Sequence, residues 1–323
     1  MNEKEIEENI YNCYLKILKR EPDIEGLKHY SELMKKGEIS TEKLEEILIK
    51  SDEFVGYKQI KKSSLKKLEN QSQAKIPKIV AMYRIQNEER WIEKSLESAS
   101  EICQEIVILD DCSTDSTVSI CKKFPNVVDI YERKEPLPLD EARDRNLLLE
   151  MALKRNPDYV LSIDGDEIIM PNSKEIFLEE LNVIYPESKI FEFQFLYVWD
   201  QLNKIRYDGL YGKTWQPRLL KIDSDFSKLR IKESNYSGNL HCGSIPIPSK
   251  LSDRLIRSNV KILHYGNFDN NLRQKKFKFY NQIDPNNQEQ DGYVHIISEK
   301  GKHSGSSGME LISLPDFMYW QFS

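Results

Sequence analysis

The chain has 323 residues, 39% of them hydrophobic and 31% charged, a balance that is typical of globular domains rather than of disordered or fibrous chains. The 47 basic and 53 acidic side chains give a formal charge of −6, so we expect no nucleic-acid partner. No apolar run of about 18 residues occurs, and the acidic start lacks the features of a signal peptide. Five scattered cysteines without a CxxC pair argue against a disulfide framework and a zinc site. We therefore expect a cytoplasmic protein.

Residues 1–58 predict a small helical module. Asp23, after Pro22, is placed to cap one helix, Gly37 follows two lysines where a helix would stop, and Ser40 or Thr41 can cap the next helix. Residues 59–76 are rich in Lys, Ser and Gln and poor in large apolar side chains. We interpret them as a linker, with the domain boundary inside it.

From residue 77 short apolar runs alternate with helical segments. Strands are expected at 78–82, 105–109, 126–131 and 159–163, and helices at 88–100, 116–124 and 140–154. This alternation predicts a parallel sheet flanked by helices, with ligands beyond the carboxyl ends of the strands. Past residue 171 we expect a helix at 173–185, a long strand at 190–199 and further mixed strands, with a turn at 303–308.

Two acidic clusters follow predicted strands. Asp110 and Asp111 come after one strand, and Asp164, Gly165 and Asp166 come after another. Two carboxylates on either side of a glycine suit a hard divalent cation that keeps open positions for diphosphate oxygens. Capping of the next helix is the plainer interpretation for either cluster.

The order of these motifs resembles that of family 2 glycosyltransferases over residues 77–171. The matching segments are IVAMYRIQNEERWIEKSLES, EIVILDDCSTDST, EARDRNLLLEMA and DYVLSIDGDE. The resemblance implies a GT-A fold, with a mixed, mostly parallel sheet flanked by helices over 77–323 and the small all-α module before it. It also implies a nucleotide-binding half at 77–171, an acceptor half at 172–323, a nucleoside-diphosphate-sugar donor, and Mn²⁺ or Mg²⁺ as cofactor.

The resemblance also assigns residues. It places Asn87 and Glu88 beside the nucleotide, Asp111 on the base, Arg145 near base and phosphates, and Asp164 at the ribose and metal. Gln86 stands where the family often has Tyr, which leaves the base identity open. The nucleotide-sugar-binding set is Arg84, Asn87, Glu88, Asp111, Arg145 and Asp164, and the metal ligands are Asp164, Asp166 and His264. His241 is a weaker candidate for a metal or phosphate contact, and Ser113, Thr114 and Asp115 fit helix capping alone.

An inverting enzyme needs a general base near the acceptor hydroxyl. The His-Glu pair of several related transferases is absent, because Cys242 follows His241. Asp208, Asp200 and Glu233 are the candidates for this base, with Asp208 favoured in a Tyr-Asp-Gly loop. The basic stretch of Arg273, Lys275, Lys276 and Lys278 predicts a solvated helix face, or else a contact for acceptor phosphate or an anionic membrane.

Residues 8–58 resemble a small helical domain of unknown function related to phycobilisome linkers, which implies an interaction or positioning role. We thus expect transfer of a sugar, with inversion, to a glycan, lipid-linked or protein acceptor in cell-envelope or surface polysaccharide biosynthesis. This function allows a protein partner that binds residues 1–58. It also allows peripheral contact of the protein with the inner face of the membrane. Two alternatives stay open: a haloacid-dehalogenase-like phosphatase using Asp164, and a degenerate transferase acting as a scaffold.

Overall fold

The computed structural model describes residues 3–18, 22–55, 76–209, 211, 213–223, 229–247, 255–285, 291–297, 309–314 and 318–320. The chain forms two compact units. The helical unit comprises residues 1–76 and 172–187, and the sheet unit comprises residues 77–171 and 188–323. The predicted linker, apart from Ile76, and the predicted turn at 303–308 lie outside the described residues.

The helical unit contains α1 (Glu3–Leu18), α2 (Ile24–Lys35) and α3 (Thr41–Lys50), and also α8 (Ser173–Glu179) with the π-helical turn Glu180–Ile184. α1 packs against α2 and α3, and Ile10 and Leu44 are fully buried. The predicted caps are confirmed, because the side chain of Asp23 accepts a hydrogen bond from Gly26 N at 2.7 Å and that of Ser40 accepts one from Lys43 N at 3.2 Å.

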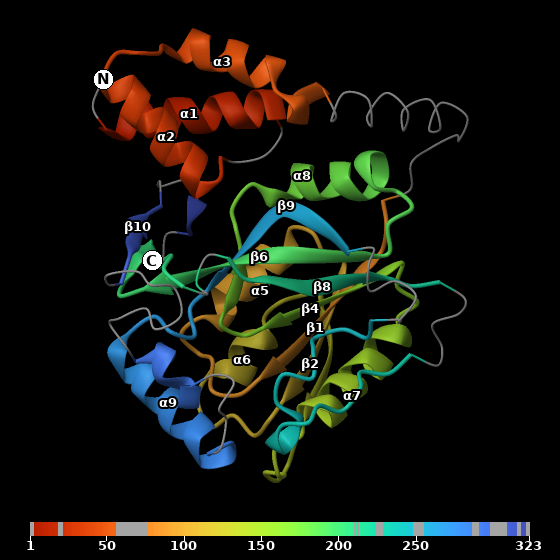
Figure 1. Ribbon diagram of the computed structural model, residues 1–323. Coiled ribbons are helices and arrows are strands. Elements are labelled where there is room, and N and C mark those ends of the chain that lie inside the picture. The colour runs from red at the N-terminus through yellow and green to blue at the C-terminus, as the bar shows by residue number, and fades with distance from the viewer. Residues whose placement is uncertain are drawn as a thin grey trace. The chain divides into compact units, whose positions relative to one another are not determined.

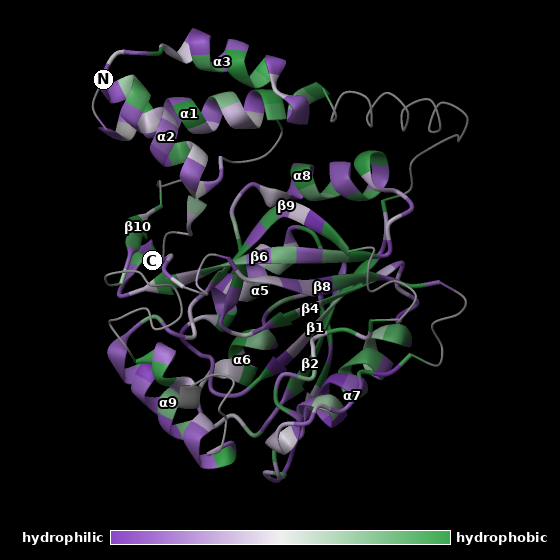
Figure 2. Ribbon diagram, in the orientation of Figure 1, coloured by the Kyte–Doolittle hydropathy of each residue, from purple (hydrophilic) through white to green (hydrophobic). Residues whose placement is uncertain are grey.

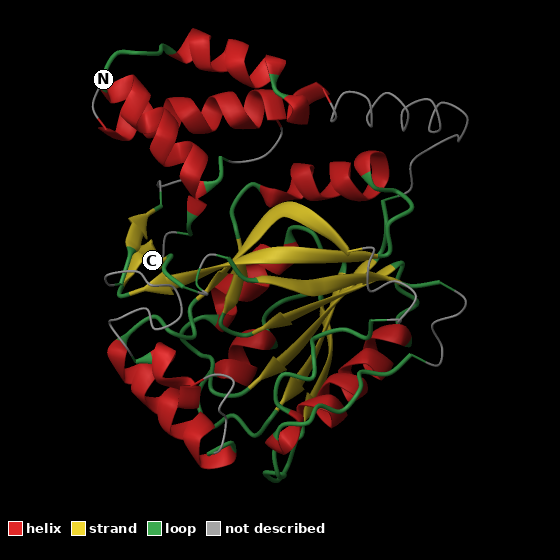
Figure 3. Ribbon diagram, in the orientation of Figure 1, coloured by secondary structure: helices red, strands yellow, loops and turns green. Residues whose placement is uncertain are grey.

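The sheet unit is built on one ten-stranded sheet (Figures 1 and 3). The strand order is β10-β7-β6-β8-β4-β1-β2-β3, β5 pairs with β9, and β9 also pairs with β6. The strands are β1 (Ile79–Ile85), β2 (Glu105–Asp110), β3 (Val127–Glu132), β4 (Tyr159–Asp164), β5 (Glu167–Ile169), β6 (Ile190–Trp199), β7 (Gln201–Arg206), β8 (Trp215–Lys221), β9 (Leu255–His264) and β10 (Leu311–Ser313).

Parallel pairing joins β3, β2, β1 and β4, and β6 with β9, while the other pairings are antiparallel. α5 (Ile92–Ser100) and α6 (Thr117–Cys121) lie on one side of the parallel strands, and α7 (Glu141–Leu153) lies on the other (Figure 1). α9 (Asn270–Ile283) follows β9, and 3-10 turns occur at Ser237–Asn239 and Asp291–Ile296. The mixed α/β sheet predicted from the sequence is therefore confirmed.

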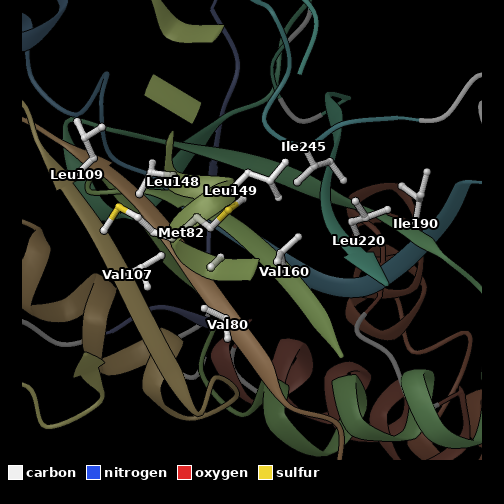
Figure 4. Close-up of a cluster of buried hydrophobic side chains, with 12 residues drawn as sticks. Val80, Met82, Val107, Leu109, Leu148, Leu149, Val160, Ile190, Leu220 and Ile245 are labelled. Carbon is white, nitrogen blue, oxygen red and sulfur yellow. The ribbon is translucent and has the colours of Figure 1, made fainter. Parts of the chain in front are cut away.

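The core next to α7 follows the two-residue period of the strands. Val80 and Met82 of β1 and Val107 and Leu109 of β2 face the same side, where they pack with Leu148, Leu149, Val160, Ile190, Leu220 and Ile245 (Figure 4). These central strands are hydrophobic along most of their length (Figure 2), as expected for strands that are buried on both faces.

Two helices are shorter than predicted. α5 begins at Ile92 rather than at residue 88, because Asn87 adopts a left-handed backbone (φ 55°) and residues 88–91 form a turn. α6 begins at Thr117, and Asp115 caps its first turn by accepting hydrogen bonds from Thr117 N and Oγ1. These turns leave a polar loop after both β1 and β2.

Candidate active site

Three parallel strands end at the same edge of the sheet. Asp164 at the end of β4 is in register with Arg84 on β1, and Asp110 at the end of β2 is in register with Ile85. Asp111 continues this pairing, because its N–H donates to the carbonyl of Ile85 at 2.8 Å. The predicted acidic clusters thus lie at the edge where open α/β sheets bind ligands.

The Asp164-Gly165-Asp166 turn leads directly into β5, and Glu167 of β5 is in register with His264 at the end of β9. One ligand atom from each of Asp166, Glu167 and His264 lies within 4.8 Å of the other two. Two carboxylates and an imidazole form a donor set that fits Mn²⁺, and less closely Mg²⁺. The structure thus brings together two predicted ligands, Asp166 and His264, and adds Glu167, which the sequence interpretation did not include.

Asp164 has arginine partners. The two terminal nitrogens of Arg145 lie 3.4 and 3.3 Å from its carboxylate oxygens, and Arg218 Nη1 lies 3.8 Å away. Burial alone raises the pKa of this carboxyl, but the charges of Arg145 and Arg218 outweigh burial and hold the pKa well below its ordinary value. Asp164 is therefore a fixed negative charge at neutral pH.

Two glutamates beside this turn share a different electrostatic environment. Glu167 accepts hydrogen bonds from Arg218 Nη2 at 2.6 Å and from Asp164 N at 3.0 Å. Burial, and then the nearby Asp164 and Asp166, raise its pKa to about 8 although Arg218 opposes the shift. Burial and the charge of Asp166 likewise raise the pKa of Glu88 to about 9. A bound cation would offset the electrostatic repulsion among these crowded carboxyl groups and favour their charged form.

Two glycines allow this crowding. A Cβ atom on Gly165 would lie 2.7 Å from Glu88 Cγ, so Glu88 contacts the turn itself. A Cβ atom on Gly266 would lie 2.1 Å from Asp166 Oδ2 and 2.9 Å from Lys276 Nζ. A real Cβ does not approach other atoms this closely, so a side chain at either position would displace these neighbouring groups.

His264 is held between Gly266 and Asp166. Gly266 N donates to its Nδ1 at 3.2 Å, and its Nε2 lies 3.8 Å from Asp166 Oδ2. Burial lowers the pKa of His264 to about 4, although Asp166 opposes the shift. The ring is therefore neutral near pH 7, which is the form that binds metals.

Asp111 and Arg84 belong to a buried ion-pair network. Arg84 Nη2 lies 3.0 Å from Asp111, its Nε lies 3.0 Å from Asp144, and Arg133 binds both carboxylates. Arg143 completes the network at 2.9 Å from Asp144, whose side chain is fully buried. Asp111 lies at the sheet edge where the nucleotide is predicted to bind, and it is paired there with the guanidinium groups of Arg84 and Arg133.

Asn87 joins the loops after β1 and β2. Its Oδ1 accepts hydrogen bonds from Thr114 N at 2.8 Å and Thr114 Oγ1 at 3.3 Å, and its N–H donates to Ser113 Oγ at 2.8 Å. The prediction that Ser113 and Thr114 cap a helix is therefore wrong, because both bind Asn87. Asp115 does accept a hydrogen bond from Thr117 N in the first turn of α6, although Ser116 occupies the N-cap position.

A cavity of about 550 Å³ opens beside the acidic turn. Asp164, Asp166, Glu167 and His264 form part of its wall, together with Arg145, Arg218 and Lys276. Tyrosine side chains at positions 197, 211, 280 and 293 line another part. The described wall therefore combines charged groups that suit phosphate and metal with rings that suit an apolar or sugar surface.

The predicted base candidates lie elsewhere. Asp208 is buried, forms two 2.8 Å hydrogen bonds with Arg206, and accepts another from Glu310 N. Asp200 sits at the β6–β7 turn with a left-handed backbone and binds Arg273 at 2.9 Å. Neither lines the described cavity, and Glu233 is exposed away from its wall. Of the weaker candidates, His241 does line the cavity.

The sequence interpretation missed several residues of this site. Glu167 directly follows the Asp-Gly-Asp motif, so its position was a usable signal. Arg218 lies on β8 about fifty residues later, and Asp144 adjoins Arg145 on α7. The partners of Arg218 and Asp144 depend on which strands pair and in what register, and this information is not contained in a local sequence pattern.

Comparison with known proteins gives two family matches. Residues 84–186 match the model for glycosyl transferase family 2, and residues 3–57 match that for a domain of unknown function, DUF4214. An uncharacterized protein of Mycobacterium tuberculosis, Rv3786c, is 31% identical over 97 residues, which are 28% of this chain and 24% of that protein. The SPbeta prophage-derived glycosyltransferase SunS of Bacillus subtilis is 33% identical over 99 residues, which are 30% of this chain and 22% of SunS. The chain thus aligns with about a quarter of the length of these relatives.

Among solved structures, residues 1–349 of Staphylococcus aureus TarS share 17% identity at a TM-score of 0.39, over 68% of this chain and 69% of that one. The assignment therefore rests on the family models, which cover the sheet edge with its acidic motifs and the three N-terminal helices. Residues 84–186, which include the acidic motifs at the sheet edge, thus match the glycosyl transferase family 2 model, and residues 3–57 match the DUF4214 model.

Proposed function

We propose that the protein is a metal-dependent glycosyltransferase that moves a sugar from a nucleoside-diphosphate-sugar donor to a glycan, lipid-linked or protein acceptor. The observation that carries this proposal is the convergence of Asp166, Glu167 and His264 on one cavity wall, beside the arginine-held Asp164. Asp166 and Glu167 lie within residues 84–186, which match the glycosyl transferase family 2 model, and β9 brings His264 to them from beyond that region. Inversion, a role in surface polysaccharide synthesis and a cytoplasmic site of action belong to the same proposal.

The residues divide the work as follows. Asp166, Glu167 and His264 would hold Mn²⁺ or Mg²⁺, which when bound neutralises charge on a departing diphosphate. Arg145 fixes Asp164, and Arg218 fixes Glu167, so these carboxylates keep their orientation before the donor arrives. Asp111 presents carboxylate oxygens at the strand edge as acceptors for a base N–H.

We propose that the acceptor binds against the part of the cavity wall that the four tyrosines line. Apolar ring faces with polar hydroxyls suit a sugar, whose C–H and O–H groups alternate. The pairs of Asp208 with Arg206 and of Asp200 with Arg273 favour structural roles for these two aspartates rather than the role of base. For residues 1–58 we propose an interaction or positioning role. We also propose that any membrane contact is peripheral. In the described part of the chain no helix combines the length and hydrophobicity needed to cross a bilayer.

The proposal is tested by incubating the purified protein with Mn²⁺ and a panel of nucleotide sugars that includes UDP-glucose, UDP-N-acetylglucosamine and GDP-mannose. We expect one of them to raise the melting temperature and to be slowly hydrolysed. Asp166→Ala should abolish both effects, whereas Asp52→Ala, an exposed aspartate of the helical unit, should leave them unchanged. Retained turnover in the Asp166 variant would refute the proposal.

Two other results would support the competing functions. Cleavage of a phosphomonoester with transient phosphorylation of Asp164 would indicate a phosphatase, and a folded protein that binds no nucleotide sugar would indicate a scaffold. Inversion is checked on the transferred product, because NMR reports the configuration of the new anomeric centre. A product with the donor's configuration would contradict it.

A further inference from the structure

Lys276 lies on the inward face of α9. Arg273, Lys276 and Tyr280 are three and four residues apart and so share one side of the helix. Arg273 is buried against the Trp199 ring at 4.4 Å, and Tyr280 and Lys276 line the cavity. Lys275 and Lys278 point to solvent on the opposite side. The lysines of the basic stretch therefore lie on two sides of the helix. Lys275 and Lys278 face solvent, and Lys276 faces the cavity.

The ammonium of Lys276 reaches the acidic turn. A Cβ on Gly266 would contact both Lys276 Nζ at 2.9 Å and Asp166 Oδ2 at 2.1 Å, so the two groups crowd the same backbone position. Within the described ranges, however, no carboxylate lies within the 4.0 Å ion-pair distance of this nitrogen. The neighbours that act on its charge are the tyrosines at 197, 211 and 280 together with Asp166.

The other cationic side chains on the described wall are already paired. Arg145 binds Asp164, and Arg218 binds Glu167. A half-buried ammonium without a carboxylate has lost part of its hydration and gains most from an incoming anion. An anion that contacts Lys276 in the cavity would lie beside the Asp166–Glu167–His264 cluster, since both face the same cavity.

We propose that Lys276 is the second cation of the donor site and binds the diphosphate of the nucleotide sugar beside the side chains that would hold the metal. The inference rests on the proposed function. As the bond between the anomeric carbon and the diphosphate oxygen breaks, its electron pair stays on that oxygen, and the acceptor oxygen forms the new bond to carbon. Lys276 keeps its proton and stabilises the oxygen by hydrogen bonding.

The same placement couples the metal to the diphosphate. Before the donor binds, the ammonium repels a cation held by Asp166 and His264, because like charges a few ångströms apart interact strongly in a partly buried site. A diphosphate bound beside both would attract both cations. Metal and nucleoside diphosphate therefore bind with positive cooperativity, and Lys276 is the source of part of it.

Lys276→Met separates these effects, with Lys275→Met and Lys278→Met as matched controls on the same helix. Binding of Mn²⁺ alone is measured from the loss of the free-ion electron paramagnetic resonance signal. Binding of UDP, GDP, uridine and guanosine is measured by calorimetry with and without Mn²⁺. We expect Lys276→Met to bind the preferred nucleoside diphosphate on the order of 10- to 100-fold more weakly, with affinity for the nucleoside unchanged. Its affinity for Mn²⁺ alone should rise, on the order of tenfold.

Opposite changes in the two affinities are the signature of this role, because general damage to the site would weaken both. Lys276→Arg should recover part of the diphosphate affinity, and the two controls should match the wild type. Unchanged diphosphate binding in Lys276→Met would overturn the inference while leaving the proposed function intact if Asp166→Ala still loses Mn²⁺ dependence. Failure of the wild type to bind any nucleoside diphosphate with Mn²⁺ would overturn both.

Discussion

Replacing Gly266 by alanine should disable the site without unfolding the protein. The added methyl would begin 2.1 Å from Asp166 Oδ2, whereas ordinary contacts start at 3.4 Å, so the carboxylate must move by about 1.3 Å. His264 Cε1 at 2.7 Å and Lys276 Nζ at 2.9 Å are displaced as well. The backbone of Gly266 is not in the left-handed region, so the effect is steric rather than conformational.

The size of the effect follows from this displacement. Shifts of about 1 Å in reacting groups cost on the order of 100-fold in rate, and disturbed ligand positioning costs roughly 10- to 100-fold in metal affinity. We expect losses of this size in Mn²⁺ affinity and in donor hydrolysis. Because the crowding involves movable side chains, the free energy of unfolding should fall by only about 1–3 kcal/mol.

The assay combines Mn²⁺ titration by electron paramagnetic resonance, donor hydrolysis and urea unfolding. Gly26→Ala is the matched control, because its methyl would lie 2.8 Å from Tyr14 Oη and 3.2 Å from Asp23 Oδ1, within the helical unit. It should lower stability and leave Mn²⁺ affinity unchanged. Wild-type metal binding and turnover in Gly266→Ala would refute the placement of Asp166 and His264.

Two further predictions concern buried ion pairs. Asp144→Asn should lose about 3 kcal/mol of unfolding free energy at pH 7, because it removes the buried carboxylate shared by three arginines. Burial alone raises the pKa of Asp144, but Arg133, Arg143 and Arg84 outweigh it and lower the pKa below the usual 3.8. The stabilisation is therefore present above the unfolded pKa of 3.8 and is lost as pH falls through the lower folded value. The difference between wild type and variant in urea unfolding should shrink steadily as the pH falls below 3.8, and a difference that stays constant on acidification would contradict the assignment. Asp208→Asn should cost a similar amount through its buried pair with Arg206, while donor hydrolysis per folded molecule stays near wild type; lost turnover at unchanged stability would instead support Asp208 as the base.

The strand ends could be predicted from sequence because their signals are local. Buried parallel strands are continuously apolar, so Asp110 and Asp164 mark where they stop, and helix caps such as Asp23 are read from the next three residues. The adjacency of His264 to Asp166 followed only from the family resemblance. The structure explains it by the pairing of β5 with β9, which is a long-range contact.

The missed features depend on burial, strand register or helical phase, which the local sequence pattern did not settle. Asp208 looked like an exposed loop acid because it stands between Tyr207 and Gly209, yet Arg206 two residues earlier binds it in the interior. The charge run on α9 could not be resolved until the helical phase was known, since only one of its lysines faces the cavity. Side-chain type indicated the chemistry, and strand register decided which groups meet.

We propose that Asp166, Glu167 and His264 hold the cation that binds the donor's diphosphate. Crystals grown with Mn²⁺ and the preferred nucleoside diphosphate allow the ion to be located by its anomalous scattering. We expect one strong peak among these three side chains, in contact with phosphate oxygens. A bound diphosphate with its Mn²⁺ at another position would contradict it.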